Sequence, residues 1–189
     1  MTQITASSDV DFASLQSRIE QLEQKCANLP DPNKFNLLVF SGDRDRLLAA
    51  FNMATGAAAC GYETSMFFTF WAAAALRRCD VQASGKNLVE RMFGWLLPKN
   101  IGATRLSRMD FAGIGRKMMC NEMKQKGVAD LEELLALSAE FQIKLSVCDA
   151  SLKIMGIKNE ELIDYDGMTV CGVATFLESC SQANTTMFV

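Results

Sequence analysis

Short apolar runs alternate with amphipathic segments along most of this chain. The run FNLLVF at residues 35–40 shows no alternation of polar and apolar positions, which is typical of a parallel strand buried on both faces. Strands are expected at five places, namely residues 35–40, 63–70, 143–148, the start of 168–183, and 185–189. Helices are expected between them, at residues 44–60, 71–78, 129–142, 149–157 and the rest of 168–183. This order predicts a single α/β domain with a parallel sheet of about five strands and helices on both faces.

An amphipathic segment precedes this domain. Residues 9–29 carry apolar side chains at heptad spacing, at Phe12, Leu15, Ile19, Leu22, Cys26 and Leu29. The pattern fits either a helix that packs on its own domain or one that pairs with a second copy, because the repeat is shorter than the roughly three to four heptads that indicate a coiled coil. Pro30 and Pro32 end the segment. We therefore expect an N-terminal helical extension over residues 1–33 and the α/β domain over residues 34–189.

A long segment interrupts the domain at about residues 80–127, and it exceeds an ordinary connection between two elements. Its first half predicts a short helix with one apolar side, formed by Leu88, Met92, Trp95 and Leu96. Its second half combines glycines, methionines and basic residues. Two interpretations stay open: a lid or oligomer contact, and a packed excursion without a function of its own.

Composition narrows the possible chemistry. The 189 residues carry a net charge of -3 and no histidine, which argues against histidine-based catalytic units, histidine metal sites and a nucleic-acid surface. The seven cysteines form no Cys-x-x-Cys pair and their number is odd, so we expect neither a metal site nor a disulfide framework. We also expect no cofactor and no membrane span. The polar N-terminus shows no secretory pattern, so we expect a cytoplasmic protein whose thiols stay reduced.

One cysteine stands where chemistry is expected. Cys148 ends the strand at residues 143–148, and a helix follows directly. Ligands of open parallel sheets collect outside the carboxyl ends of the strands, and a helix N-terminus favours a negative charge there by roughly 0.3–1 kcal/mol. The carboxylate of Asp149 either opposes a thiolate or caps the helix and faces away, and Lys153, one turn on, could offset it. Cys148 is therefore either a reachable, modestly activated nucleophile or a buried structural cysteine.

Two other strand ends are expected at the same edge. Ser41, Gly42 and Asp43 follow the first strand, and Phe70 and Trp71 stand at the end of the second. The loop formed by Ser41, Gly42 and Asp43 could present N–H groups to an anion such as a thiosulfonate. Asp43 is also a candidate cap for the next helix. The loop lacks the glycine fingerprint and the lysine of a nucleotide site. Trp71 is either a pocket wall or a core residue.

Longer stretches of this sequence carry a family resemblance. They are VFSGDRDRLLAAFNMATGAAACGYETSMFFTFW (39–71), MFGWLLPKN (92–100), MDFAGIGRKMMCNEMKQKGVADLEELLALSAEF (109–141) and CDASLKIMGIKNEELIDYDGMTVCGVATFLE (148–178). Over about residues 34–180 the chain resembles the DsrE-like family, and more narrowly its second subfamily, often labelled "peroxiredoxin family". The Pro-x-x-x-Thr-x-x-Cys motif of true peroxiredoxins is absent from the sequence.

The resemblance implies a DsrE/DsrF-like fold and a role in intracellular sulfur transfer, in which a cysteine holds sulfane sulfur as a persulfide or thiosulfonate. The family's cysteine falls on Cys148. The resemblance also implies a homo-oligomer that exchanges sulfur with a rhodanese or a TusA-like carrier. The expected pocket residues are Ser41, Gly42, Asp43, Trp71, Asp149 and Ser151.

Two further cysteines are candidates for a second thiol. Cys171 occupies a position that looks like glycine in the relatives, and it precedes a predicted helix. It could resolve a persulfide into a disulfide. Cys120 lies in the insertion. Each is otherwise a packed cysteine, the default for this residue type. The alternative function is a non-catalytic oligomeric scaffold or regulator, or an α/β domain that binds a small ligand.

Overall fold

The computed structural model describes residues 12–189 except residues 28, 80, 82 and 84. The chain divides into two units, Met1–Pro30 and Asp31–Val189. In the first unit, helix α1 spans Phe12–Ala27. The start of the predicted helix, before residue 12, lies outside the described residues. The two interpretations of its heptad pattern both stay predictions.

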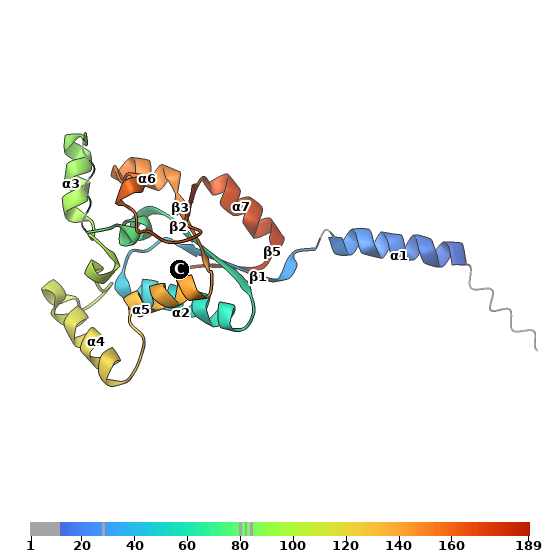
Figure 1. The fold of residues 1–189 in the computed structure, drawn as a ribbon, viewed down its shortest axis with the longest axis horizontal. Coiled ribbons are helices and arrows are strands. Elements are labelled where there is room, and N and C mark those ends of the chain that lie inside the picture. Colours follow the sequence, from blue (N-terminus) through green and yellow to red (C-terminus); the bar gives the residue numbers. More distant parts are fainter. Residues whose placement is uncertain (1–11, 28, 80, 82, 84) are drawn as a thin grey trace, which may run out of the picture. The chain divides into compact units, whose positions relative to one another are not determined.

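A five-stranded sheet forms the centre of the second unit, with strand order β4-β3-β2-β1-β5 (Figure 1). Neighbouring strands all pair in parallel. The strands are β1 (Asp31–Val39), β2 (Glu63–Phe68), β3 (Lys144–Cys148), β4 (Thr169–Cys171) and β5 (Ala183–Phe188). The predicted α/β class and the predicted number of parallel strands are therefore confirmed.

Helices connect these strands. They are α2 (Arg44–Ala59), α3 (Leu88–Leu96), α4 (Ile114–Gln125), α5 (Leu131–Glu140), α6 (Asp149–Met155) and α7 (Val173–Gln182), with short 3-10 turns η1 (Phe70–Leu76), η2 (Ile101–Ala103), η3 (Phe111–Gly113) and η4 (Asn159–Glu161). The expected helix at residues 71–78 is η1 instead of an α-helix. It ends at Leu76 because Arg77 is extended and forms a bridge with Leu162.

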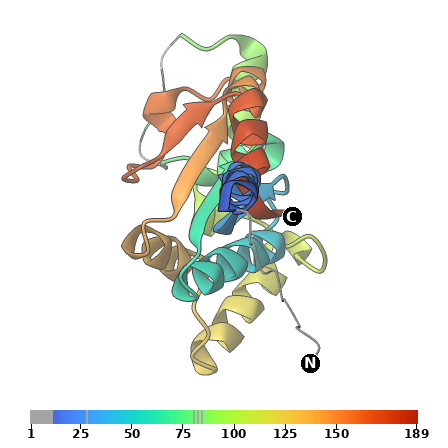
Figure 2. The same ribbon diagram turned by 90° about the vertical axis from the view of Figure 1, so that its right-hand side faces the viewer.

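The two faces of the sheet have different partners (Figures 1 and 2). On one face, Leu37, Met66 and Leu145 are fully buried with α2 and α5, and the ring of Phe68 lies 5.9 Å from that of Phe51 on α2. On the other face, α7 packs through Phe176, whose ring stacks on Phe67 at 4.7 Å. Because strand residues alternate between faces, positions 146 and 148 of β3 lie on the α7 side.

The carboxyl ends of the strands meet at one edge. Val39 pairs with Phe68, and Phe68 pairs with Val147, so the residues that follow β1, β2 and β3 lie at the same level. Cys148 also pairs with Cys171 at the end of β4. The strand ends that the sequence analysis assigned to one edge are therefore adjacent.

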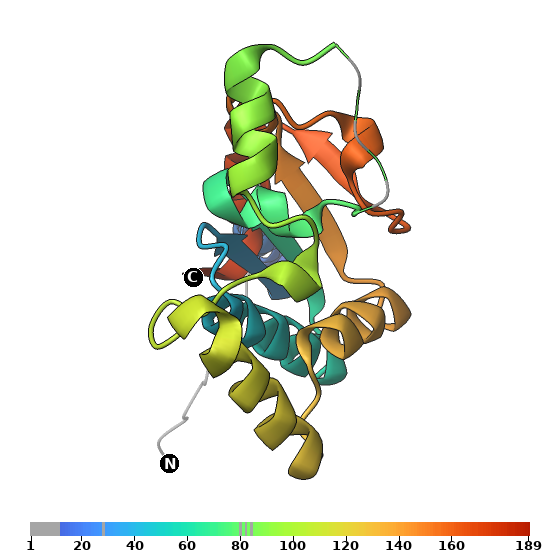
Figure 3. The same cartoon turned by 90° about the vertical axis from the view of Figure 1, so that its left-hand side faces the viewer.

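The segment at residues 80–127 contributes α3, η2, η3 and α4 in its described part (Figure 3). The apolar side of α3 is largely exposed at Leu88, Met92, Trp95 and Leu96. In the described part of the chain, no helix has both the length and the apolar character that crossing a bilayer requires.

Candidate functional site at the carboxyl edge of the sheet

Cys148 occupies the junction that the sequence analysis singled out. It is the last residue of β3 and the N-cap of α6. Its side chain lies on the α7 face with Phe67 and Phe176. The residue is 7% exposed, so the thiol is nearly buried, with the Phe176 ring of α7 in the same cluster.

Two hydroxyl groups stand beside this thiol. The Ser151 Oγ atom lies 3.0 Å from the Thr69 Oγ1 atom, and it accepts a hydrogen bond of 2.9 Å from the Phe70 backbone N–H. Since Phe70 supplies that proton, the proton of Ser151 is available to the Cys148 sulfur. The end of β2 and the first turn of α6 thus meet around the thiol.

The surroundings of Cys148 act on its pKa in opposite directions. Burial raises the pKa, because a thiolate is poorly solvated among apolar groups. Hydrogen bonds from the hydroxyl and backbone N–H of Ser151, the hydroxyl of Thr69 and the backbone N–H of Ala150 lower it. The hydrogen bonds prevail, so the pKa of Cys148 lies below its usual value. A lowered pKa increases the thiolate fraction at neutral pH, which is the reactive form.

The backbone at Phe70 is strained where it meets the site. Phe70 has a φ of 45°, in the left-handed region that side chains rarely adopt and that costs about 1–3 kcal/mol. Its N–H bonds Ser151, and its ring lies 5.3 Å from that of Phe40. The strained turn orients a donor toward the hydroxyl group beside the thiol.

The α6 helix is fixed at both ends. At its start, the Asp149 carboxylate pairs with Lys153 at 2.7 Å on the exposed side of the helix, so Asp149 neither caps the helix nor lies unpaired beside the thiol. At its end, Gly156 has a φ of 64°, and a Cβ atom there would overlap the Glu90 side chain of α3. Only glycine fits this position, because the conformation is left-handed and the space is occupied.

The remaining predicted pocket residues line a separate cavity. Ser41, Gly42, Asp43 and Trp71 share a cavity of about 470 Å³ with Trp95, Leu96, Leu97, Pro98, Lys99, Ala103 and Arg105. Cys148, Asp149 and Ser151 do not belong to its lining. The expected single pocket therefore divides into this cavity and the thiol site, which are joined through the consecutive residues Phe70 and Trp71.

The Ser41–Asp43 loop is held by short contacts. The Asp43 carboxylate accepts a hydrogen bond of 2.9 Å from the Ser41 hydroxyl. Asp43 is the N-cap residue of α2, but its side chain makes no capping bond there. A Cβ atom on Gly42 would lie 2.6 Å from the carbonyl oxygen of Trp71, so glycine allows the ends of β1 and β2 to approach closely.

The two candidate second thiols have different positions. Cys171 pairs directly with Cys148 across β3 and β4 and packs in the same cluster. Cys120 lies on α4 and lines a cavity with Arg44 and Asp130, on the side of α2 and α5. The described structure therefore brings Cys171, and not Cys120, to the thiol site.

Sequence reasoning missed several residues near this edge. Thr69 was missed because the predicted strand at residues 63–70 included it, whereas β2 ends at Phe68 and Thr69 follows directly. Phe176 gave no local signal, because the sequence does not show which face of the sheet the helix that carries it covers. A buried carboxylate, Glu161, was also missed.

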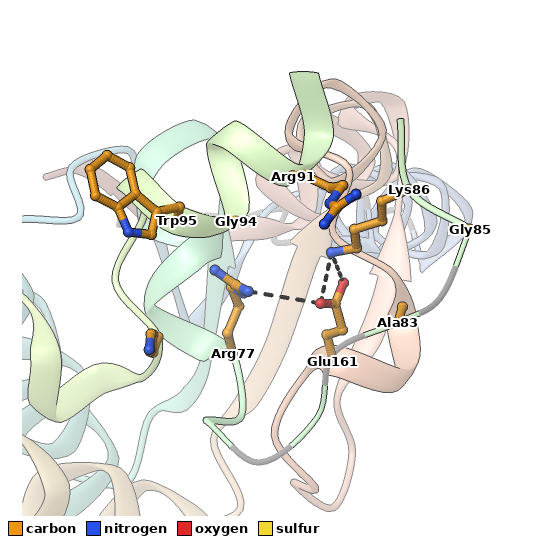
Figure 4. A pocket seen from close by; sticks show the side chains of 9 residues that line it. Arg77, Ala83, Gly85, Lys86, Arg91, Gly94, Trp95 and Glu161 are labelled. Carbon is orange, nitrogen blue, oxygen red and sulfur yellow. Dashed lines mark hydrogen bonds and ion pairs between the residues drawn. The ribbon is translucent and has the colours of Figure 1, made fainter. Parts of the chain in front are cut away.

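Glu161 lies beside a cavity of about 480 Å³ (Figure 4). The side chain is fully buried, its oxygens lie 2.7 and 2.5 Å from Lys86 Nζ, and Arg77 Nη2 lies 3.8 Å away. Burial raises the pKa of Glu161, but the Lys158 N–H and Lys86 lower it below its usual value. The cluster joins η1, η4 and the start of the insertion.

Fold and site together define a parallel α/β protein with an acidic, nearly buried thiol at the carboxyl edge of its sheet. The sequence model of the DsrE/DsrF/DrsH-like family matches residues 31–188, and the chain belongs to this family. The resemblance found in the sequence is thereby confirmed at the level of the family. The narrower subfamily label stays a prediction.

Individual relatives agree with this assignment. The chain is 35% identical over 153 residues to the uncharacterized protein YrkE of Bacillus subtilis (strain 168), covering 81% of this chain and 94% of the relative. It is 28% identical over 162 residues to the sulfur carrier protein DsrE2 of Allochromatium vinosum, covering 84% and 99%. The YchN protein of E. coli has a similar fold, with a TM-score of 0.51, 10% identity, and coverage of 83% of this chain and 99% of that one.

Proposed function

We propose that this protein carries sulfane sulfur on Cys148 as a persulfide. The observation that carries the proposal is the position of Cys148 at the end of β3 and at the N-cap of α6, where the meeting hydroxyl groups of Ser151 and Thr69 hold the pKa of this thiol below its usual value. The similarity to a relative named as a sulfur carrier supports it. Hydrogen-bonded thiolates react without an imidazole base, and the sequence contains no histidine.

The loading step is an exchange between sulfur atoms. The Cys148 thiolate attacks a sulfane sulfur of a polysulfide, a sulfur–sulfur bond of the donor breaks, and a shorter polysulfide leaves with the electron pair. The persulfide then passes its outer sulfur to an acceptor thiolate, which regenerates the Cys148 thiolate. A rhodanese or a TusA-like carrier in the cytoplasm has the right chemistry for either exchange.

Intact-mass spectrometry after incubation with inorganic polysulfide tests the proposal. The protein should gain the mass of one sulfur atom, and dithiothreitol should remove it. Cys148→Ser should abolish this adduct, whereas Cys60→Ser, at an exposed cysteine after α2, should leave it unchanged. An adduct that persists in Cys148→Ser would assign the sulfur to another residue and refute the proposal.

A non-catalytic scaffold is the second candidate, and the exposed apolar side of α3 favours it. Large exposed apolar patches mark interaction sites. On this hypothesis the protein is a homo-oligomer whose assembly is independent of its thiols. Light scattering of the intact protein and of a variant lacking residues 1–30 measures whether assembly depends on the N-terminal unit. Unchanged partner binding after all thiols are blocked would favour the scaffold over the carrier.

A further inference from the structure

Cys148 and Cys171 form an in-register pair on neighbouring strands. Two residues earlier, Ser146 and Thr169 form the equivalent pair, and their hydroxyl oxygens lie 3.1 Å apart. Side chains of paired residues lie on the same face, and this face repeats every second residue. The two sulfur atoms therefore lie on the same face, next to one another.

The spacing of this pair permits a disulfide. Neighbouring strands lie about 4.8 Å apart, and the Cα atoms of disulfide-bonded cysteines lie about 4.4–6.8 Å apart. Cys171 ends β4, a three-residue strand at the edge of the sheet. An edge strand of this length has few interactions that resist the small movement needed to bring two sulfur atoms into bonding distance.

The same apolar cluster surrounds both thiols. Phe67 and Phe176 are its buried aromatic residues, and Cys171 packs against it, half-buried. Burial raises the pKa of Cys171, and the negative charge on Cys148 raises it further. When Cys148 is a thiolate, its neighbour is thus a protonated thiol that can supply a proton.

We propose that Cys171 is a resolving thiol, so that the loaded site releases sulfide and closes into a Cys148–Cys171 disulfide. This step rests on the proposed function, because it begins from the Cys148 persulfide. The proton of Cys171 passes to the outer sulfur of the persulfide, and the Cys171 thiolate attacks the inner sulfur. A new bond forms between the two cysteine sulfurs, the persulfide bond breaks, and hydrosulfide leaves with the electron pair. The two cysteines are oxidised and the sulfane sulfur is reduced, so no external oxidant is needed.

The structure selects Cys171 rather than Cys180 for this role. Cys180 also packs against the cluster, but it lies on α7, without a strand pairing to Cys148. Cys180→Ser is therefore a matched control within the same cluster. Cys171→Ser removes the second thiol and keeps the size and polarity of the side chain similar.

The test follows polysulfide-loaded protein under anaerobic conditions after excess donor is removed. In the natural sequence, the one-sulfur adduct should decay to a species two hydrogens lighter than the reduced protein, with one equivalent of sulfide released. In Cys171→Ser the adduct should persist at least about tenfold longer. Cys180→Ser should behave like the natural sequence. Trypsin releases residues 145–153 with Cys148, and cleavage after Glu178 separates Cys171 from Cys180, so peptide mapping identifies the disulfide.

The outcomes separate the two proposals. If the adduct forms but decays equally in the natural sequence and in Cys171→Ser, Cys171 is not a resolving thiol, whereas the carrier function stands. A disulfide between Cys148 and Cys180 also overturns the inference. If Cys171→Ser, shown to be folded by circular dichroism, takes up no sulfur while the natural sequence does, Cys171 is needed for loading and the resolving role is overturned, whereas no uptake by the natural sequence refutes the carrier function itself. Cys171→Ala provides a second variant should the serine disturb the cluster.

Discussion

The hydroxyl oxygens of Thr69 and Ser151 lie 3.0 Å apart, although 82 residues separate them in the sequence. This contact joins the end of β2 to the first turn of α6, and both hydroxyl groups stand among the causes that lower the pKa of Cys148. The acidity of the thiol thus depends on two elements that meet only in the folded chain. Hydroxyl donors replace the imidazole that many cysteine sites use.

Ser151→Ala should make Cys148 less acidic. A hydrogen bond to a charged acceptor contributes about 1.5–3 kcal/mol, so the alkylation rate at neutral pH should fall by about tenfold or more. The measurement is the rate of iodoacetamide modification of Cys148 across pH, whose midpoint should move upward. Ser138→Ala is the control, because that buried hydroxyl bonds Leu134 on α5. Equal midpoints in both variants would contradict the assigned role of Ser151.

Phe176→Leu should increase access to Cys148 and also lower its pKa, because the thiol becomes less buried. The Phe176 ring stacks on Phe67 beside the thiol, and a smaller side chain leaves more room. At a pH where Cys148 is fully ionised, alkylation should be several times faster, and the pH midpoint should move downward. The variant should lose about 1–1.5 kcal/mol of stability, as hydrophobic swaps in a core do. A shifted midpoint with an unchanged maximal rate would show that Phe176 affects the charge and not the access.

Glu161→Gln should destabilise the fold by about 3–5 kcal/mol, because it leaves the buried Lys86 and Arg77 without their shared carboxylate. The pKa of Glu161 is lowered in the folded state. Its stabilisation is therefore complete above its ordinary pKa of 4.5 and is lost as the pH falls through the lower folded value. Urea unfolding between neutral pH and pH 3 measures both effects.

The control for that experiment is Glu63→Gln. Glu63 pairs with Lys144 on the surface, where both side chains are more than half exposed, so its loss should cost less than about 1 kcal/mol. Similar losses for the two variants would show that the Glu161 cluster contributes no more than a surface pair.

Gly42→Ala should destabilise the protein by about 1–3 kcal/mol, because its Cβ atom would collide with the Trp71 carbonyl oxygen and force a backbone shift. Gly56→Ala is the matched change. Its Cβ atom would meet no atom within 4 Å, and alanine in a helix is favoured by about 1 kcal/mol. Thermal unfolding should therefore move in opposite directions for the two variants, and a stable Gly42→Ala protein would disprove the close contact.

The sequence predicted those parts of the molecule that depend on local pattern. The apolar run before Cys148 and the amphipathic segment at residues 129–142 indicated a strand and a helix, and both are present. The shared edge followed from the parallel order of the strands, since that order fixes where their ends lie. The match to the family confirmed the resemblance carried by residues 34–180.

The rest depended on contacts between distant residues. The pairing of Cys171 with Cys148 requires the order of the strands and a register within a three-residue strand, and neither has a signal in the sequence. The burial of Cys148 follows from Phe176 on α7, a helix that covers the same face of the sheet as the Cys148 side chain. The expected pocket is divided in two because consecutive residues of η1 serve different places. The Phe70 N–H bonds Ser151 beside the thiol, whereas Trp71 lines the separate cavity.

The contact between Gly156 and Glu90 links the insertion to the helix that begins at Cys148. The helix that donates amide protons to Cys148 is only two turns long, and its far end rests against α3. Displacement of α3 would therefore release one support of that helix and alter the amide geometry at the other. In this fold, a segment remote from the thiol in sequence supports the helix that begins beside the thiol.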